Sequence, residues 1–172
     1  HLVWIQDAYT TSDGYPYAEP YRGWFNYIRN SVKVVIDAYS GDVTFYVIDD
    51  EDPVLAIYRE ALPVLFRPLS DMPDSLRRHL RYPRDLFDAQ AGMYQNYHVT
   101  VPQVFYNGED VWAQPREKYG GEQIVMQPYF ILTRLPGENE LQFLLMTPLT
   151  PNNRDNMIAW MAARSDFPGY GE

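Results

Sequence analysis

A short phrase occurs twice near the start of the chain, and it constrains the fold more than any other feature. IQDAYT at residues 5–10 is echoed by IDAYS at residues 36–40, where an alternating apolar run ends in an acid, Ala and Tyr. The second copy continues through Gly41 into the apolar run Val43–Ile48. A glycine between two such runs is typical of a β-hairpin. The repeated phrase therefore predicts a scaffold of antiparallel strands.

The size and composition of the chain favour a folded protein. Its 172 residues fit a single domain over residues 1–172, and 46% hydrophobic residues are enough for a packed core. A net charge of −9 disfavours nucleic acid and anionic membrane surfaces as partners. The absence of cysteine excludes disulfides, thiolate metal sites and thiol nucleophiles.

The hydrophobic period changes from that of a strand to that of a helix after the acid run at residues 49–52. Asp52 can cap a helix that has Pro53 at its first position, and Pro63 should end that helix near Leu62. Further helices are predicted over residues 70–80 and 83–98. Strands are predicted at residues 2–5, 33–39, 43–49, 124–135 and 141–146, with Pro128 marking an edge or a bulge. We expect residues 115–121 to form a loop.

The last apolar pattern predicts a C-terminal helix. Thr150-Pro151 supplies a cap and a first helical residue, and Met157, Ile158, Met161 and Ala162 form an apolar stripe that ends near Arg164. The whole pattern indicates an α+β fold. It has an antiparallel sheet built from hairpins (about five strands), with helices inserted in the middle and at the C-terminal end.

Five spaced tracts carry a resemblance to a known family: DAYTTS at 7–12, NYIRNSVK at 26–33, HLRYP at 79–83, PQVFYN at 102–107 and TPNNRDNMIAW at 150–160. They resemble the large uncharacterised "UPF" family of bacterial, including cyanobacterial, multi-pass membrane proteins. The resemblance implies a full-length protein in the cell membrane, with several N-terminal transmembrane helices followed by a large extracytoplasmic domain. This chain would be an excised part of that domain and would not itself span the membrane. The family has no established activity and so supplies no catalytic residues. Ser165 stands where the resemblance leads us to expect Cys.

Both ends of the chain support the same interpretation. The chain begins at His1 inside a strand-like run, and residues 168–172 have no helix or tail character. We therefore expect a piece of a longer, membrane-anchored polypeptide.

Two groups of acids are candidate sites. The run of Asp49, Asp50, Glu51 and Asp52 offers clustered carboxylates for Ca²⁺, although helix capping and a solvated corner explain it adequately. Asp7 and Asp37 occupy matching places in the repeated phrase. If their strands paired in register, the two carboxylates could lie within reach of each other, which is the geometry that glycoside hydrolysis uses. Acids at strand ends are also common turn formers.

One basic cluster, Arg77, Arg78, Arg81 and Arg84, is a candidate site for an anionic ligand or an acidic partner. The alternative is a solvated helix face that pairs with Asp74, Asp85 and Asp88. His79 and His98 lack zinc-site spacing, and the sequence has no Gly-rich phosphate loop and no GxSxG elbow.

Taken together, these features predict a non-catalytic extracytoplasmic structural or interaction domain that needs no cofactor or metal. Its expected partners are the remaining domains of the same polypeptide, or an envelope protein or glycan. The alternatives are an enzyme acting on envelope glycans and a domain that senses an anionic ligand.

Overall fold

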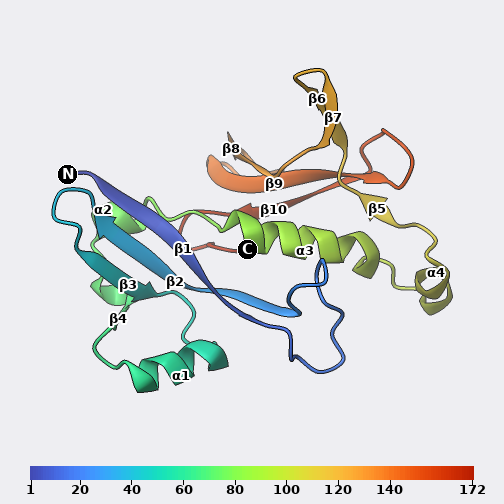
Figure 1. Ribbon diagram of the computed structural model, residues 1–172. Helices are drawn as coiled ribbons and strands as arrows, with labels where there is room; N and C mark the ends of the chain where they lie inside the picture. Colours follow the sequence, from blue (N-terminus) through green and yellow to red (C-terminus); the bar gives the residue numbers. More distant parts are fainter. The chain divides into compact units, whose positions relative to one another are not determined.

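The computed structural model describes residues 1–172, which divide into two compact units, His1–Leu86 (unit 1) and Phe87–Glu172 (unit 2). Unit 1 contains a four-stranded sheet, and unit 2 contains a second four-stranded sheet and a separate two-stranded hairpin (Figure 1). Strands and helices are both present in quantity, so the predicted α+β fold is confirmed. No helix combines the length and the apolar character needed to cross a membrane.

The sheet of unit 1 has the order β1-β2-β3-β4. Its first three strands are antiparallel neighbours, and β4 lies parallel to β3. The predicted β2–β3 hairpin is confirmed, with Gly41 at φ 77° in its turn, where a side chain would be strained. The elements of unit 1 are β1 Val3–Ser12, β2 Tyr27–Asp37, β3 Val43–Val47, α1 Pro53–Ala61, β4 Phe66–Pro68, the 3₁₀ helix η1 Leu69–Asp71 and α2 Asp74–Arg77.

The two faces of this sheet are covered by different segments. On one face, Val32, Val34 and Val47 pack with Leu55 of α1 in a buried cluster. On the other face, Lys33 donates a hydrogen bond to the carbonyl of Arg81, so the segment after α2 lies there. Alternation along β2 explains the division, since neighbouring residues of a strand point to opposite faces.

Helix α1 begins and ends where the sequence predicts. Asp52 caps it, Pro53 is its first residue, and Leu62 is its C-cap. The predicted second helix is shorter than expected, because residues 69–77 form η1 and α2 as separate pieces. The third helix is confirmed as α3 Arg84–Tyr97, which runs from the end of unit 1 into unit 2.

The sheet of unit 2 is centred on β9, which pairs antiparallel with β10, β5 and β8. Strands β6 and β7 form the two-stranded hairpin. After α3, the elements of unit 2 are α4 Pro102–Asn107, β5 Trp112–Ala113, β6 Arg116–Tyr119, β7 Glu122–Val125, β8 Tyr129–Thr133, β9 Gln142–Pro151 and β10 Ala159–Arg164.

The predicted C-terminal helix is wrong, because residues 159–164 form strand β10. These residues pair in register with residues 144–149 of β9, whose Leu144, Leu145 and Leu149 are almost fully buried. Residues 142–151 are strand throughout, so Thr150 and Pro151 end β9 instead of capping a helix. A long partner strand outweighs a short apolar pattern that suits either structure.

Two smaller predictions in unit 2 also need correction. The expected loop at 115–121 contains β6, and the tight turn to β7 is made by Gly120 and Gly121, both at positive φ. The single strand expected over 124–135 is divided around Pro128 into β7 and β8, since proline cannot donate to a ladder. The structure therefore has ten strands where about five were expected.

The pairing of β1 with β2 contains a register shift that changes which side chains face α1. Ala8 faces Val32, but Thr10 faces Arg29, so β2 carries one extra residue there. Such a β-bulge lets neighbouring side chains reach the same side of a sheet. Accordingly, Ser31 donates to Asp52 on the α1 side, while the next residue, Val32, packs against α1.

Four donors from β1, β2 and α1 meet at the carboxylate of Asp52, which is 1% exposed. Its oxygens accept hydrogen bonds from the hydroxyls of Thr10 at 2.5 Å, Tyr27 at 2.6 Å and Ser31, and from the backbone N–H of Val54 at 2.9 Å. Burial by itself raises the pKa of Asp52, but the hydrogen bonds outweigh it, and the pKa is lowered below its ordinary value. Asp52 therefore joins β1, β2 and α1 as an ionised group.

Replacing Asp52 by Asn should destabilise the protein by about 3 kcal/mol, because the amide group cannot accept from the same set of donors. Asp50→Asn is the matched control. Its exposed ion pair with Arg59 (2.7 Å) should contribute less than about 1 kcal/mol. Urea denaturation at neutral pH measures both changes, and equal losses would contradict the structural role of Asp52.

The difference in stability between the wild type and Asp52→Asn should depend on pH. A carboxyl whose pKa is lower in the folded state stabilises the protein above its unfolded pKa of 3.8 and loses that contribution as the pH falls further. The stability gap between the wild type and Asp52→Asn should therefore be full at neutral pH and shrink below about pH 4.

Candidate functional site

The most unusual ionisable group in unit 1 is Lys33, whose side chain is 1% exposed. It lies directly opposite Asp7 in the β1–β2 register and forms an ion pair with it. A second N–H of its ammonium donates to the carbonyl of Arg81 at 2.9 Å. Burial lowers the pKa of Lys33, although the carboxylate of Asp7 opposes this effect.

Tyr9 extends this polar cluster along the same face of β1. Its hydroxyl forms a hydrogen bond with Asp85, just after the segment that covers this face of the sheet. The pKa of Tyr9 is raised above its ordinary value, first by burial and then by the negative charges of Asp7 and Asp85. The phenol therefore stays neutral and acts as a donor at physiological pH.

The cluster contains groups that enzymes use, but its geometry favours a structural role. The amine of Lys33 is buried, and two of its N–H groups already donate to Asp7 and to the Arg81 carbonyl. A nucleophilic lysine needs a lone pair that a substrate can approach. The cluster thus fastens the segment around Arg81 to the sheet.

The register does not bring Asp7 and Asp37 together. Asp7 faces Lys33, whereas Asp37 faces Val3 at the far end of the pair. The two positions are four residues apart along the strands, a spacing of about 13 Å, which exceeds the separation used in glycoside hydrolysis. Asp37 instead accepts from the backbone N–H groups of Tyr39 and Ser40, as a turn former does.

The carboxylates of the acid run at residues 49–52 do not gather at one place. Asp49 pairs with Arg29 at 2.8 Å, Asp50 pairs with Arg59, and Asp52 is buried in its own hydrogen bonds. The carboxylate of Asp49 also accepts from the backbone N–H of Glu51. No three carboxylate or imidazole groups gather in a way that would hold a metal ion.

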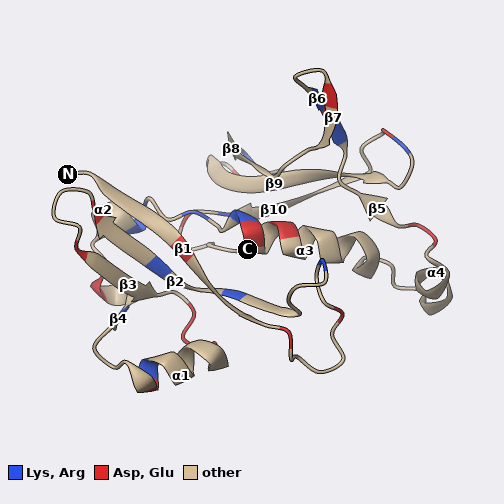
Figure 2. Ribbon diagram, in the orientation of Figure 1, with Lys and Arg blue, Asp and Glu red and all other residues tan.

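The arginine cluster lies on α2 and the residues that follow it. Arg77 donates to the carbonyl of Leu69, and Arg81 donates to the carbonyls of Arg78 and Leu80. Figure 2 shows acidic residues in the first turns of α3, directly after this cluster, and Arg84 begins that helix. Two of the four arginines therefore serve local backbone groups, and anion binding by the cluster stays a prediction.

Helix α1 and the turn after it carry exposed apolar residues. Only Leu55 of this helix is fully buried, whereas Ile57 is 69% exposed. Val64, in the turn after the helix, is 96% exposed. We define the α1 surface as the exposed residues Ile57, Tyr58, Leu62, Val64 and Leu65. Contiguous exposed apolar residues are typical of a docking site.

Part of this surface was visible in the sequence. The apolar stripe at Ile57, Tyr58 and Leu62 predicts the helix, but periodicity does not say whether a stripe faces the core. Lys33 is not singled out by the sequence, because its partner Asp7 lies on another strand. Its place in the run SVKVVI, between apolar residues, was the available signal.

Comparison with known proteins identifies the family. The sequence profile of the uncharacterised protein family UPF0182 matches residues 1–172. A UPF0182 protein of Salinibacter ruber is 55% identical over 98% of this chain and 18% of its own length. UPF0182 proteins of Synechococcus elongatus and Methanospirillum hungatei are 56% and 52% identical over 99% of the chain, and the matches span 18% and 20% of those proteins. No solved structure matches the chain.

The chain therefore spans about a fifth of the length of the curated relatives it matches. The profile match agrees with the family resemblance found in the sequence, and the partial coverage is consistent with an excised part of a larger protein.

The ion pair of unit 1 predicts an asymmetric response to mutation. Asp7→Asn removes the negative charge that faces a buried ammonium and should cost about 3 kcal/mol. Lys33→Met should cost less, because the carboxylate of Asp7 is 30% exposed and water can solvate it. Asp37→Asn, which keeps its turn-forming oxygen, serves as the control and should change stability by less than about 1 kcal/mol. Thermal or urea unfolding measures all three, and a larger loss in Lys33→Met than in Asp7→Asn would refute the assignment.

Proposed function

This chain belongs to the uncharacterised protein family UPF0182, and from this premise we propose that it is a non-catalytic, extracytoplasmic interaction module of a longer integral membrane protein. Its partner is another part of the same polypeptide. The membrane location rests on the resemblance to multi-pass proteins, and the interaction role rests on the surface of unit 1.

The observation that carries the proposal is the α1 surface. A helix that sits on a sheet normally turns its apolar stripe inward. Here α1 buries Leu55 and leaves Ile57, Tyr58 and the following Val64 exposed. Leaving apolar area in water costs free energy, so such a surface favours a partner that covers it.

The length of the relatives supports a partner within the same polypeptide. The aligned region takes up 18–20% of each compared relative, so four-fifths of such a protein lies outside it. An intramolecular partner is present at high effective concentration, and a modest apolar surface then suffices for docking.

The ionisable groups support a non-catalytic role. Asp52 accepts four hydrogen bonds within the fold, and Lys33 is held by Asp7 and a carbonyl. Asp7 and Asp37, the candidate pair for a glycan-acting enzyme, lie apart, because Asp7 faces Lys33 in the middle of the β1–β2 pairing and Asp37 faces Val3 at its end. The groups with perturbed pKa values are thus engaged in structure and do not face a common reacting point.

Docking can be tested by expressing the 172-residue chain apart from the remainder of a full-length family member and measuring their association in detergent. The wild-type chain should bind the remainder. Ile57→Ser combined with Val64→Ser should bind at least about tenfold more weakly, because two apolar side chains leave the interface. The unfolding midpoint of the isolated chain should change little, since both residues are exposed.

Leu132→Ser combined with Leu141→Ser is the control, because these two leucines of unit 2 are also exposed apolar residues but lie outside the α1 surface. This variant should bind as the wild type does. If the wild-type chain fails to bind the remainder, or if both double variants bind equally, the docking proposal fails.

The location can be tested separately because the chain has no cysteine. Glu122→Cys places one thiol at an exposed position of β7 in a full-length protein otherwise free of cysteine. A membrane-impermeant maleimide should label it in intact cells while a cytoplasmic marker stays unlabelled. Labelling that requires permeabilised cells would show that the proposed side of the membrane is wrong.

A further inference from the structure

Unit 2 contains a pocket that none of the arguments above uses. Its volume is about 510 Å³, which lies within the range of small-molecule sites. Two segments line it, the loop between α4 and β5 and the turn between β9 and β10. The N–H of Asn152 donates to the carbonyl of Val111 at 2.9 Å, and Trp112 pairs with Pro151, so the two walls are fastened to each other.

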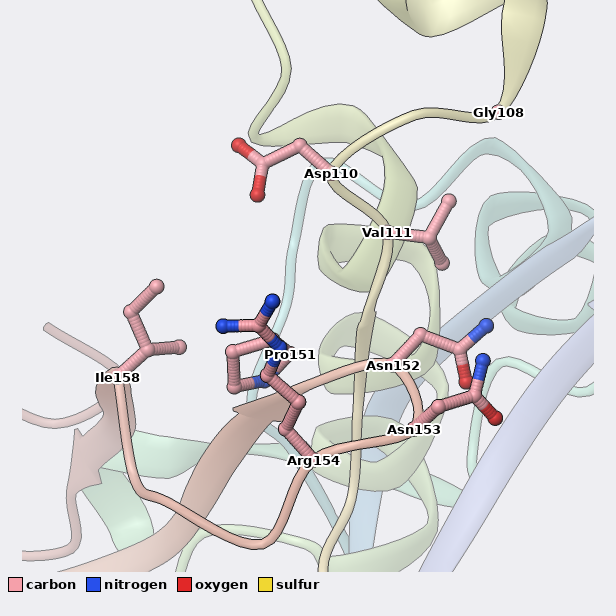
Figure 3. Close-up of a pocket in the computed structure, with 8 residues that line it drawn as sticks. All are labelled: Gly108, Asp110, Val111, Pro151, Asn152, Asn153, Arg154 and Ile158. Atoms are coloured by element: carbon pink, nitrogen blue, oxygen red, sulfur yellow. The ribbon is translucent and has the colours of Figure 1, made fainter.

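The walls carry opposite charges that do not pair with each other. Figure 3 shows the side chains of Asp110 and Arg154 extending into the same space, with Ile158 beside them. Asp110 lies 3.9 Å from the imidazole of His98, and the backbone N–H of Arg154 donates to the carbonyl of Pro151. The amide groups of Asn152 and Asn153 point away from this space (Figure 3).

A buried imidazole, that of His98, lies next to Asp110. The side chain of His98 is 7% exposed, and its ring stacks on Trp112 with centroids 3.6 Å apart. Its Nδ1 lies 3.0 Å from the carbonyl oxygen of Tyr94, but its Nε2 has no hydrogen-bond partner and faces Asp110. A buried polar atom without a partner is costly and uncommon, and it often marks a place that another group completes.

The backbone holds both charged walls in unusual conformations. Asp110 has φ 58°, and Asn153, next to Arg154, has φ 64°. Asp and Asn tolerate this left-handed region better than other residues, but it still costs free energy that the surrounding structure must offset. These conformations fix where the carboxylate of Asp110 and the turn that carries Arg154 lie.

We propose that this pocket binds a small zwitterion of the α-amino acid class. The carboxylate of the ligand pairs with the guanidinium of Arg154, which can hold it through two parallel N–H groups. The ammonium of the ligand pairs with Asp110, and its hydrocarbon part packs on Ile158 and Pro151. A ligand with a single charge would pair with only one of the two walls.

The test is an NMR titration of the whole chain with glycine, leucine, glutamate and lysine, each up to about 10 mM. At least one of them should produce saturable shifts in the backbone amides of residues 108–112 and 152–158. For that amino acid, the N-acetylated form and the carboxamide form each lack one charge and should bind at least about tenfold more weakly.

Two variants separate the walls of the pocket. Arg154→Met removes the positive charge and keeps an apolar stem, and Asp110→Asn removes the negative charge while suiting the positive φ. Each should weaken binding at least about tenfold, whereas Arg134→Met, at an exposed position outside the pocket, should bind as the wild type.

Three outcomes would overturn the proposal. They are no saturable shifts with any of the four amino acids, equal affinity for the blocked forms, and wild-type binding by both pocket variants. Unfolding midpoints measured alongside show that a loss of binding is not a loss of folding. None of these outcomes bears on the docking proposal, which concerns unit 1.

Discussion

The hydrogen bonds to Asp52 connect β1, β2 and α1, the three elements that position the α1 surface in unit 1. A buried carboxylate is tolerated only when donors replace the water that it loses. Thr10 comes from β1, Tyr27 and Ser31 from β2, and Val54 from α1. Because one charged group connects these elements, the α1 surface and the sheet register are fixed by the same interaction.

Much of unit 1 could be predicted from local sequence because its signals are local. Asp52 followed by Pro53 marks a helix start, and Gly41 between two apolar runs marks a hairpin, whatever the rest of the chain does. Residues 150–164 were predicted wrongly for the opposite reason. Their spacing suits a helix, and only the pairing of β10 with β9 decides for a strand.

The candidate sites were harder to predict than the elements that carry them. The repeated phrase suggested a pairing of Asp7 with Asp37. In the structure Asp7 pairs with Lys33, and that contact depends on the strand register. The pocket of unit 2 joins Asp110 to Arg154 through strand pairing between distant segments. His98 was correctly predicted at the end of a helix, yet its stacking on Trp112 could not be read from one segment.

The extra residue in β2 sets a limit on how this family's chain length can vary. Tyr27 and Ser31 meet Asp52 because the bulge between Arg29 and Val32 shifts the alternation of side chains along β2 by one residue. Deleting Asn30 would restore regular pairing, with Tyr27 still opposite Ser12, but it would place Ser31 opposite Tyr9 and turn its hydroxyl away from Asp52. Substitutions within this stretch change one contact at a time, whereas a deletion here removes the bulge and the hydrogen bond from Ser31 to Asp52 together. Over evolution, the spacing between Tyr27 and Val32 should therefore vary less than the residues that fill it.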